Sequence, residues 1–171
     1  MGNPKSREYR RRLEHEQAWA AARETPRRFD EGVHIPGTGL LRVQFVRAPS
    51  FEQGYAWDLR EYRGEWGVFR SRVVDDISDG RLIGYEELAA PGVQFQGCYE
   101  RLLALSIPLA PLRAPIMGLD GTSYLLTIGE FFSAVRISWW VACPPEWQAL
   151  ADIVDELYDA LRQLPAKEAG Q

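Results

Sequence analysis

Two runs of alternating apolar and polar residues, joined by a short glycine-containing connection, constrain the fold of this chain more than any other feature. The runs are GYAWDLREY and EWGVFRSRVV, and Arg63-Gly64 lies between them. Alternation with a period of two is typical of a half-buried strand, and a two-residue connection with glycine joins strands that pair antiparallel. The sequence therefore predicts a β-hairpin, and it indicates a sheet built from hairpins and not from βαβ units.

Similar patterns predict further strands, in residues 41–45, RLIGYEEL, LDGTSYLLTIGE and FFSAVRISWWVA. The last two segments form a second predicted hairpin. Trp139 and Trp140 are adjacent in it, so their side chains point to opposite faces of the strand. One of them is therefore either covered by another element or exposed, where it could anchor a partner protein.

Three segments carry helical signals. Residues 6–23 are rich in helix formers but have a thin apolar stripe, so this helix should dock loosely. The segment FQGCYERLLALS and the segment after Pro144-Pro145 repeat apolar residues at helical spacing, and the latter has an acidic opposite face. The intervening IPLAPLRAPIMG contains three prolines and is predicted to be an extended crossing back to the sheet.

These elements predict an α+β fold with an antiparallel sheet of five or six strands. The C-terminal amphipathic helix and the shorter central helix should cover one face, with the charged N-terminal helix at an edge. A chain of 171 residues is long enough for one well-buried core. The predicted organisation is a charged helix and linker in residues 1–30, a single α+β domain in residues 31–165 and a frayed tail in residues 166–171.

Charge is distributed unevenly along the chain. Through residue 28 there are eight basic and four acidic side chains, and because the net charge is −4, the remaining residues carry −8. A basic segment can contact nucleic acid, but interleaved glutamates favour a solvated helix face or an intramolecular contact, so nucleic acid is not an expected partner. No signal peptide or membrane span is recognisable, which predicts a cytoplasmic protein.

The stretch VVDDISDGRLIGYEE raises the question of a metal site. Counted from Asp75, Asp79 and Glu86 occupy ligand positions of a calcium loop. However, Ile77 at the third position cannot bind a cation, and the flanking patterns are those of strands, whereas an EF-hand needs helices. Asp-Gly favours a turn, so the stretch is interpreted as a connecting loop, with weak divalent binding as the alternative. No metal or cofactor is predicted.

No nucleophile and base are recognisable as a catalytic arrangement. His15 lies in the charged helix and His34 in the linker, while Cys98 and Cys143 have neither a disulfide framework nor metal-ligand spacing. An enzyme is therefore not expected, and no catalytic residue is assigned. The alternative is a small-molecule binder or enzyme with a pocket between the sheet and the central helix, which a polar pocket around His34 or Cys98 would favour.

The segments YAWDLREYRGEWGVFRS and LDGTSYLLTIGEFFSAVRISWWVACPPEWQALADIVDELYDAL resemble small uncharacterised bacterial α+β proteins, some of which look like immunity proteins that protect a cell from a toxin. In that pattern an Asp-Gly turn opens a strand, a Trp-rich strand follows, and a Pro-Pro step begins the terminal helix. The resemblance covers about half of the chain. It implies a tight protein partner and an acidic contact surface.

The resulting hypothesis is a non-enzymatic protein-binding module, such as an immunity protein that neutralises a basic bacterial toxin through an acidic surface. The candidate contact residues are Asp75, Asp76, Asp79, Glu86 and Trp140. The sequence does not specify an oligomeric state.

Overall fold

The computed structural model of this chain describes residues 4–29, 38–74, 80–109, 120–130 and 133–168. The strands within these ranges are β1 (Arg27–Arg28), β2 (Leu40–Pro49), β3 (Tyr55–Tyr62), β4 (Glu65–Val74), β5 (Arg81–Leu88), β6 (Thr122–Glu130) and β7 (Ser133–Trp140). The helices are α1 (Pro4–Glu24), α2 (Val93–Leu103) and α3 (Gln148–Leu161), the last preceded by a 3₁₀ turn, η1 (Pro145–Trp147).

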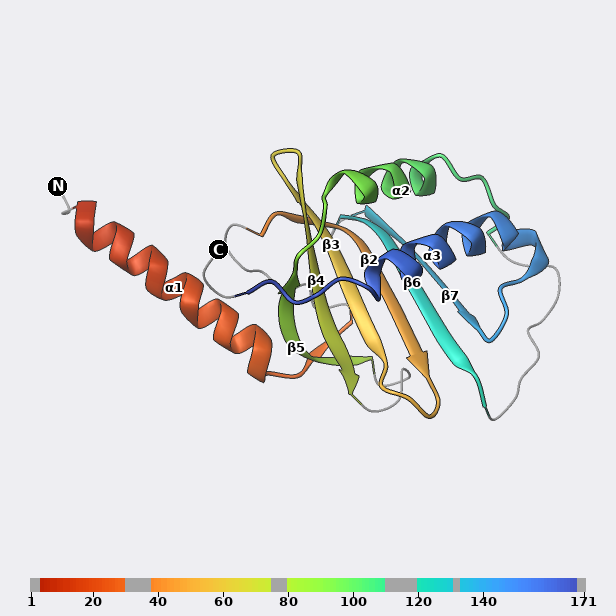
Figure 1. The fold of residues 1–171 in the computed structure, drawn as a ribbon, viewed down its shortest axis with the longest axis horizontal. Helices are drawn as coiled ribbons and strands as arrows, with labels where there is room; N and C mark the ends of the chain where they lie inside the picture. The colour runs from red at the N-terminus through yellow and green to blue at the C-terminus, as the bar shows by residue number, and fades with distance from the viewer. Residues whose placement is uncertain (1–3, 30–37, 75–79, 110–119, 131–132, 169–171) are drawn as a thin grey trace.

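The seven strands of the described residues form one antiparallel sheet in the order β1-β5-β4-β3-β2-β6-β7. Figure 1 shows α1 at the β5 end of this sheet, with α2 and α3 across one of its faces. All six pairs of neighbouring strands are antiparallel, and in four of these pairs the two strands are consecutive in sequence, as in hairpins. The predicted α+β class is therefore confirmed.

The hairpin predicted around Arg63-Gly64 is present as β3 and β4. Pairing runs from Tyr55 opposite Arg72 to Tyr62 opposite Glu65. Arg63 and Gly64 have φ angles of 54° and 85°. Positive φ at both central positions belongs to the tight turn whose twist matches that of paired strands, so local backbone chemistry determines the register of this hairpin.

The sheet has one strand more than the upper limit predicted from the sequence. The additional strand is β1, which lies in the segment interpreted as a linker and pairs Arg27 with Leu82 and Arg28 with Arg81. Next to it, the Phe29 N–H donates to the Gly80 carbonyl oxygen at 2.6 Å. A strand of two residues is too short to show an alternating pattern, so no periodicity could have predicted it.

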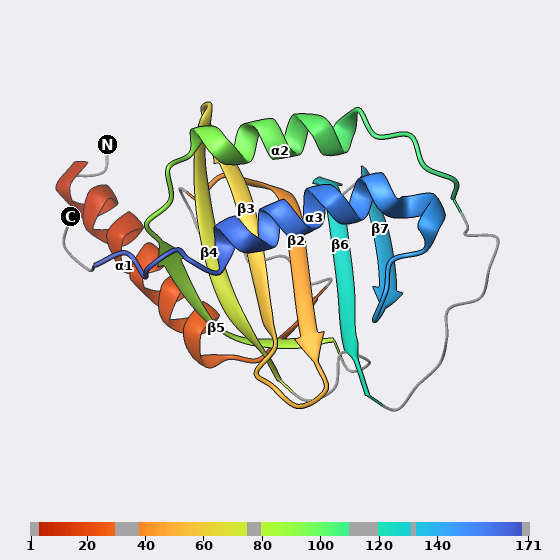
Figure 2. The same ribbon diagram turned by 45° about the vertical axis from the view of Figure 1, so that its right-hand side comes forward.

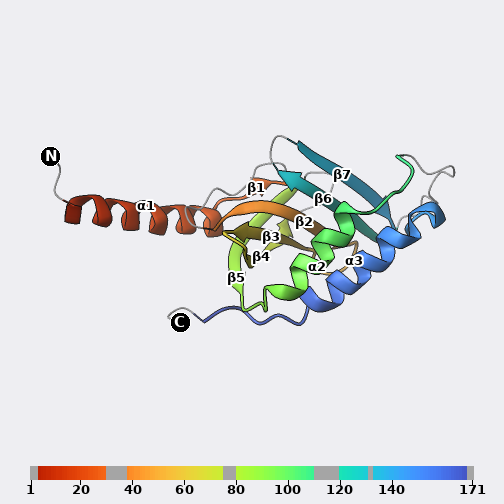
Figure 3. The ribbon, with the colours of Figure 1, turned by 90° about the horizontal axis from the view of Figure 1, so that it is seen from above.

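The main apolar core lies between the sheet and the two helices α2 and α3, which run side by side over the same face (Figures 2 and 3). Phe45 and Trp57 stack on neighbouring strands, and Leu150 and Leu157 of α3 are fully buried. Burial of such a side chain contributes about 1.5–3 kcal/mol. The apolar stripe predicted from the sequence is thus the face through which α3 packs.

The sequence predicts a frayed tail in residues 166–171, but Ala166 and Lys167 are paired with β5, while residues 169–171 lie outside the described residues. Ala166 forms a β-bridge with Leu88, and the Lys167 N–H donates to the Glu87 carbonyl oxygen at 2.9 Å. This pairing covers part of the β5 edge, and an exposed edge is otherwise prone to pair with other chains. Most of IPLAPLRAPIMG, the predicted extended crossing, lies outside the described residues. None of the helices in the described part of the chain is long and apolar enough to cross a membrane.

Candidate partner-binding site

The contact residues predicted from the sequence do not form one surface in the part of the chain that is described. Asp75, Asp76 and Asp79 lie outside the described residues. Glu86 is on β5 and Trp140 is on β7, with four strands between them in the sheet. The structure therefore does not bring Glu86 and Trp140 together, and the role of the three aspartates stays a prediction.

The two adjacent tryptophans of β7 are both half-buried. Trp139 stacks on Tyr124 of β6 with ring centroids 5.2 Å apart. Trp140, which points to the other face, lies so close to Gly121 that a Cβ there would be 2.9 Å from the indole. Each indole is therefore used in part for packing within its own hairpin region.

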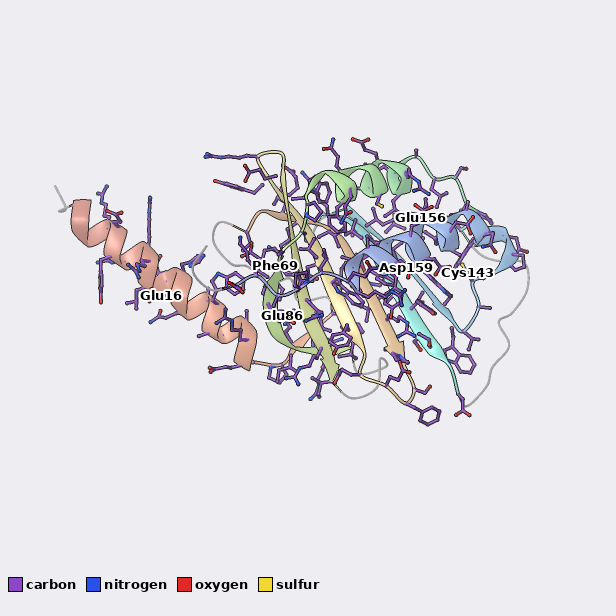
Figure 4. All side chains as sticks on the ribbon, in the orientation of Figure 1. Glu16, Phe69, Glu86, Cys143, Glu156 and Asp159 are labelled. Atoms are coloured by element: carbon purple, nitrogen blue, oxygen red, sulfur yellow. The ribbon has the colours of Figure 1, made fainter. Side chains whose placement is uncertain are left out.

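A cleft of about 1040 Å³ lies at the other end of the sheet. It is bounded by the C-terminal half of α1, the turn end of the β3–β4 hairpin, the end of β5 and the C-terminal segment that pairs with β5. Figure 4 labels Glu16, Phe69 and Glu86, which lie on α1, β4 and β5 around it. The cleft thus joins segments from both termini and the middle of the chain.

Aromatic side chains line the cleft and attach α1 to the sheet. The ring centroid of Trp19 on α1 is 5.9 Å from that of Phe69 and 5.7 Å from that of Tyr85. Phe69 and Tyr85 stack at 5.1 Å. On another wall, Trp66 packs against Tyr99 of α2 with centroids 5.3 Å apart. Aromatic pairs contribute about 0.5–1.5 kcal/mol beyond their buried area, so Trp19 holds α1 in place.

Acidic side chains outnumber basic ones around the cleft. The lining glutamates are Glu16, Glu24, Glu65, Glu86, Glu87 and Glu168. Among the described lining residues, only Arg23 and Lys167 carry the opposite charge, with histidine counted as neutral.

Three of these glutamates have cationic partners. Glu16 pairs with Arg12, Glu86 with Arg70, and Glu87 with Lys167. Glu24, Glu65 and Glu168 make no ion pair with another described residue. The cleft therefore has a negative electrostatic potential that its own side chains do not neutralise.

A buried polar cluster on the sheet face opposite α2 and α3 fixes the chain where α1 ends. Arg27 donates to Ser71 Oγ at 2.6 Å, and its guanidinium carbon lies 4.9 Å from the centroid of the Tyr85 ring. Gln44 Nε2 donates to Asp58 Oδ1 at 3.0 Å. Burial lowers the pKa of Arg27, an effect that the negative charge of Asp58 opposes. This cluster holds β1 and therefore sets the position of the α1 wall of the cleft.

The cysteines lack the features of a catalytic nucleophile. Burial raises the pKa of the Cys143 thiol to about 11, and the negative charge of Asp155 adds to this shift. Burial likewise raises the pKa of Cys98. A thiol must ionise to act as a nucleophile, so burial lowers the reactivity of both at neutral pH.

The space between the sheet and α2 is occupied by apolar side chains. Val68 of β4 and Phe95 of α2 are fully buried there, and Leu102 is nearly so. The alternative of a polar pocket at this place therefore gains no support from the described residues, and His34 lies outside them. Nor does the described part of the chain gather three or more His, Cys, Asp or Glu side chains in a way that could hold a metal ion.

Sequence reasoning missed most of the cleft. The neighbouring carboxylates Glu86 and Glu87 are visible in the sequence, but adjacent strand residues point to opposite faces and do not by themselves form a site. What makes the site is the approach of α1, the hairpin turn and residues 166–168 to the end of β5. No local pattern predicts this approach, because it depends on contacts between segments far apart in sequence.

Comparison of the chain with protein-family models, with curated proteins and with solved structures gives no match. The assignment of a site therefore depends on geometry and charge alone.

Proposed function

We propose that this chain is a protein-binding module whose cleft captures a positively charged segment of a partner protein. The observation that carries the proposal is the combination of six glutamates and the indoles of Trp19 and Trp66 around one cleft. Carboxylates attract lysine and arginine, and aromatic faces attract the same cations, most strongly in tryptophan. Both kinds of group therefore favour the same ligand chemistry.

The charge of the cleft also favours rapid association with a basic partner. Complementary potentials steer two proteins together and raise the association rate, and the effect weakens as salt screens the charges. Neutralisation of a bacterial toxin with a basic active-site cleft, which the resemblance to immunity proteins implies, is one role of this kind. In that role the partner segment would occupy the cleft, and the toxin's own active site would be covered.

A defined peptide tests the proposal without knowledge of the natural partner. The probe is a short peptide of arginine and glycine, compared with a peptide of glutamate and glycine of equal length, with binding measured by calorimetry. We expect binding of the arginine peptide only. Glu24→Gln combined with Glu65→Gln should weaken it about threefold to tenfold, because exposed ion pairs contribute about 0.2–1 kcal/mol each.

The matched control is Asp152→Asn combined with Asp155→Asn on the exposed face of α3. It changes the net charge by the same amount but lies outside the cleft. Equal weakening by both pairs of substitutions would show that overall charge, and not the cleft, attracts the peptide. Absence of arginine-peptide binding by the unmodified chain, at protein concentrations where it is monomeric, would contradict the proposed function directly.

A further inference from the structure

Helix α1 has two halves with different surroundings. Toward its C-terminus Ala22 is buried and Trp19 is half-buried against the sheet. Residues 7–14, called the arm below, are all exposed, and they extend past the β5 end of the sheet (Figures 1 and 3). Isolated helices shorter than about 12–15 residues are marginal in water, so the arm would be stabilised by a binding surface.

The arm carries the charge opposite to that of the cleft. It has four arginines (Arg7, Arg10, Arg11 and Arg12) and two glutamates (Glu8 and Glu14). Two large apolar side chains are also exposed on it, Tyr9 at 70% and Leu13 at 40% of their surface. A basic helical segment with an aromatic and an aliphatic side chain has the properties expected of a ligand for the acidic, aromatic-lined cleft.

The apolar side chains of the arm continue the stripe of α1 that lines the cleft. Tyr9, Leu13, Glu16 and Ala20 follow one another at intervals of four, three and four residues. Residues at these spacings share one face of a helix, and the last two already line the cleft. The same helix face is therefore part of the cleft at one end and unpartnered within the described chain at the other.

We infer that two copies of the chain associate through α1, with the arm of each copy in the cleft of the other. In an antiparallel pair of α1 helices about a two-fold axis, Tyr9 of each copy can lie beside Ala20 of the second copy, and Leu13 beside Glu16. Large side chains then face small or flexible ones, as helix packing requires. The interface is self-complementary and closes at two copies.

Charge favours a second copy over the other classes of partner for the arm. In the pair each arginine-rich arm meets a cleft with an excess of glutamate, and Arg10 and Arg12 flank the apolar stripe. The glutamates Glu8 and Glu14 would oppose the phosphates of a nucleic acid. The inference rests on the proposed function, because it requires that the cleft accept a basic segment.

Charge exchange tests the inference on the full chain. Sedimentation is measured over a range of protein concentrations for the unmodified chain, for an arm variant (Arg10→Glu with Arg12→Glu) and for a cleft variant (Glu24→Arg with Glu65→Arg). We expect the unmodified chain to dimerise, and each variant to associate about tenfold more weakly or worse, because like charges then face each other. Combining the two variants should restore the dimer.

Salt and a matched control separate the α1 interface from general charge effects. Raising the salt from about 0.1 M to about 1 M shortens the Debye length from ~10 Å to ~3 Å and should weaken the dimer of the unmodified chain. Reversal of Asp152 and Asp155 to arginine on α3 should leave dimerisation unchanged. Circular dichroism should show that each variant retains its helices.

Two results would overturn the inference, and each differs from failure of the proposed function. One is a chain that stays monomeric at all concentrations, including a monomer that binds duplex DNA through Arg10 and Arg12. The other is a dimer that the combined variant does not restore. The arm variant changes no residue that lines the cleft and frees Glu16 from its ion pair with Arg12, so it should still bind the arginine peptide, and more tightly once the competing arm is gone. If it binds the peptide while the unmodified chain is monomeric, only the dimer is excluded.

Discussion

At β3 the two faces of the sheet are equally buried but differ in chemistry. Trp57 and Asp58 are neighbours on β3, and each is 3% exposed. Trp57 belongs to the apolar core beneath α3, whereas Asp58 accepts a hydrogen bond from Gln44 and lies near Arg27 on the opposite face. One strand therefore separates a purely apolar core from a face where buried charge and hydrogen bonds lie beside a smaller apolar cluster that includes Val46, Ala56 and Leu82.

This difference explains how the two faces hold their covering elements. Apolar burial is non-directional, so α3 needs only a stripe of suitable residues to pack. A buried charge cluster is directional and is favourable only when all its members are present. The chain adds the second kind of contact to the aromatic packing of Trp19 where β1 and the end of α1 meet the sheet, and the position of the cleft depends on that junction.

The largest expected effect is that of Asp58→Ala. Removal of this buried carboxylate takes away the hydrogen-bond acceptor of Gln44 and the negative charge that acts on Arg27, and leaving a buried charge uncompensated costs about 3–5 kcal/mol. The free energy of unfolding in urea should fall by about 4 kcal/mol. Asp155→Ala on the exposed surface of α3 is the control and should change it by no more than about 0.5 kcal/mol. Similar losses for the two substitutions would mean that the cluster is not a stabilising unit.

Leu157→Ala tests the apolar face and should have the next largest effect. Leu157 is a fully buried residue of α3, and substitution of a buried leucine by alanine costs about 2–5 kcal/mol, so we expect a loss of about 3 kcal/mol by urea denaturation. The volume-conserving Leu157→Met should cost less than about 1.5 kcal/mol. Asp58→Asn conserves shape in the same way but removes the charge, so it should be tolerated less well than Leu157→Met. The reverse order would contradict the contrast between the faces.

The apolar face is the part of the fold that the sequence predicted well. Its signals are local: alternation in β3 and β4, two residues suited to positive φ at the turn, and apolar residues of α3 at steps of three and four. Each signal lies within about ten to fifteen residues, because periodicity and turn chemistry act over that distance.

The polar face and the cleft could not be predicted in this way. Arg27 and Ser71 are separated by 44 residues, and Gln44 and Asp58 lie on different strands. In the sequence they look like ordinary polar positions of half-buried strands, because the alternating pattern assumes one solvated face. The sequence pattern does not indicate that both faces of these strands are buried. This burial, and not the identity of any single residue, is what the prediction lacked.

Trp19→Ala should have a smaller, local effect at the junction between α1 and the polar face. The side chain is half-buried and contacts Phe69 and Tyr85, so its removal should cost about 1–2 kcal/mol. Hydrogen exchange should show faster exchange of α1 amides with unchanged protection in α3. Gln17→Ala, exposed on the same helix, should leave both unchanged. Loss of protection in both helices would instead mean that α1 and α3 unfold as one unit.

The smallest expected effect is a dependence of stability on alkaline pH that is confined to the polar face. Burial raises the pKa of Tyr85 well above its ordinary value, and the negative charge of Asp58 raises it further. The protonated phenol is therefore favoured in the folded state, so this contribution to stability is complete below pH ~10, where a free tyrosine ionises, and is lost as the pH rises above it. Between pH ~10 and ~11 the loss should be about 1 kcal/mol, since one pKa unit corresponds to about 1.4 kcal/mol.

Tyr85→Phe should abolish this loss, while Tyr62→Phe, at a position 46% exposed, should preserve it. If both variants retain the alkaline loss, another group on either face ionises first, and the polar cluster is less sensitive to charge than its burial implies.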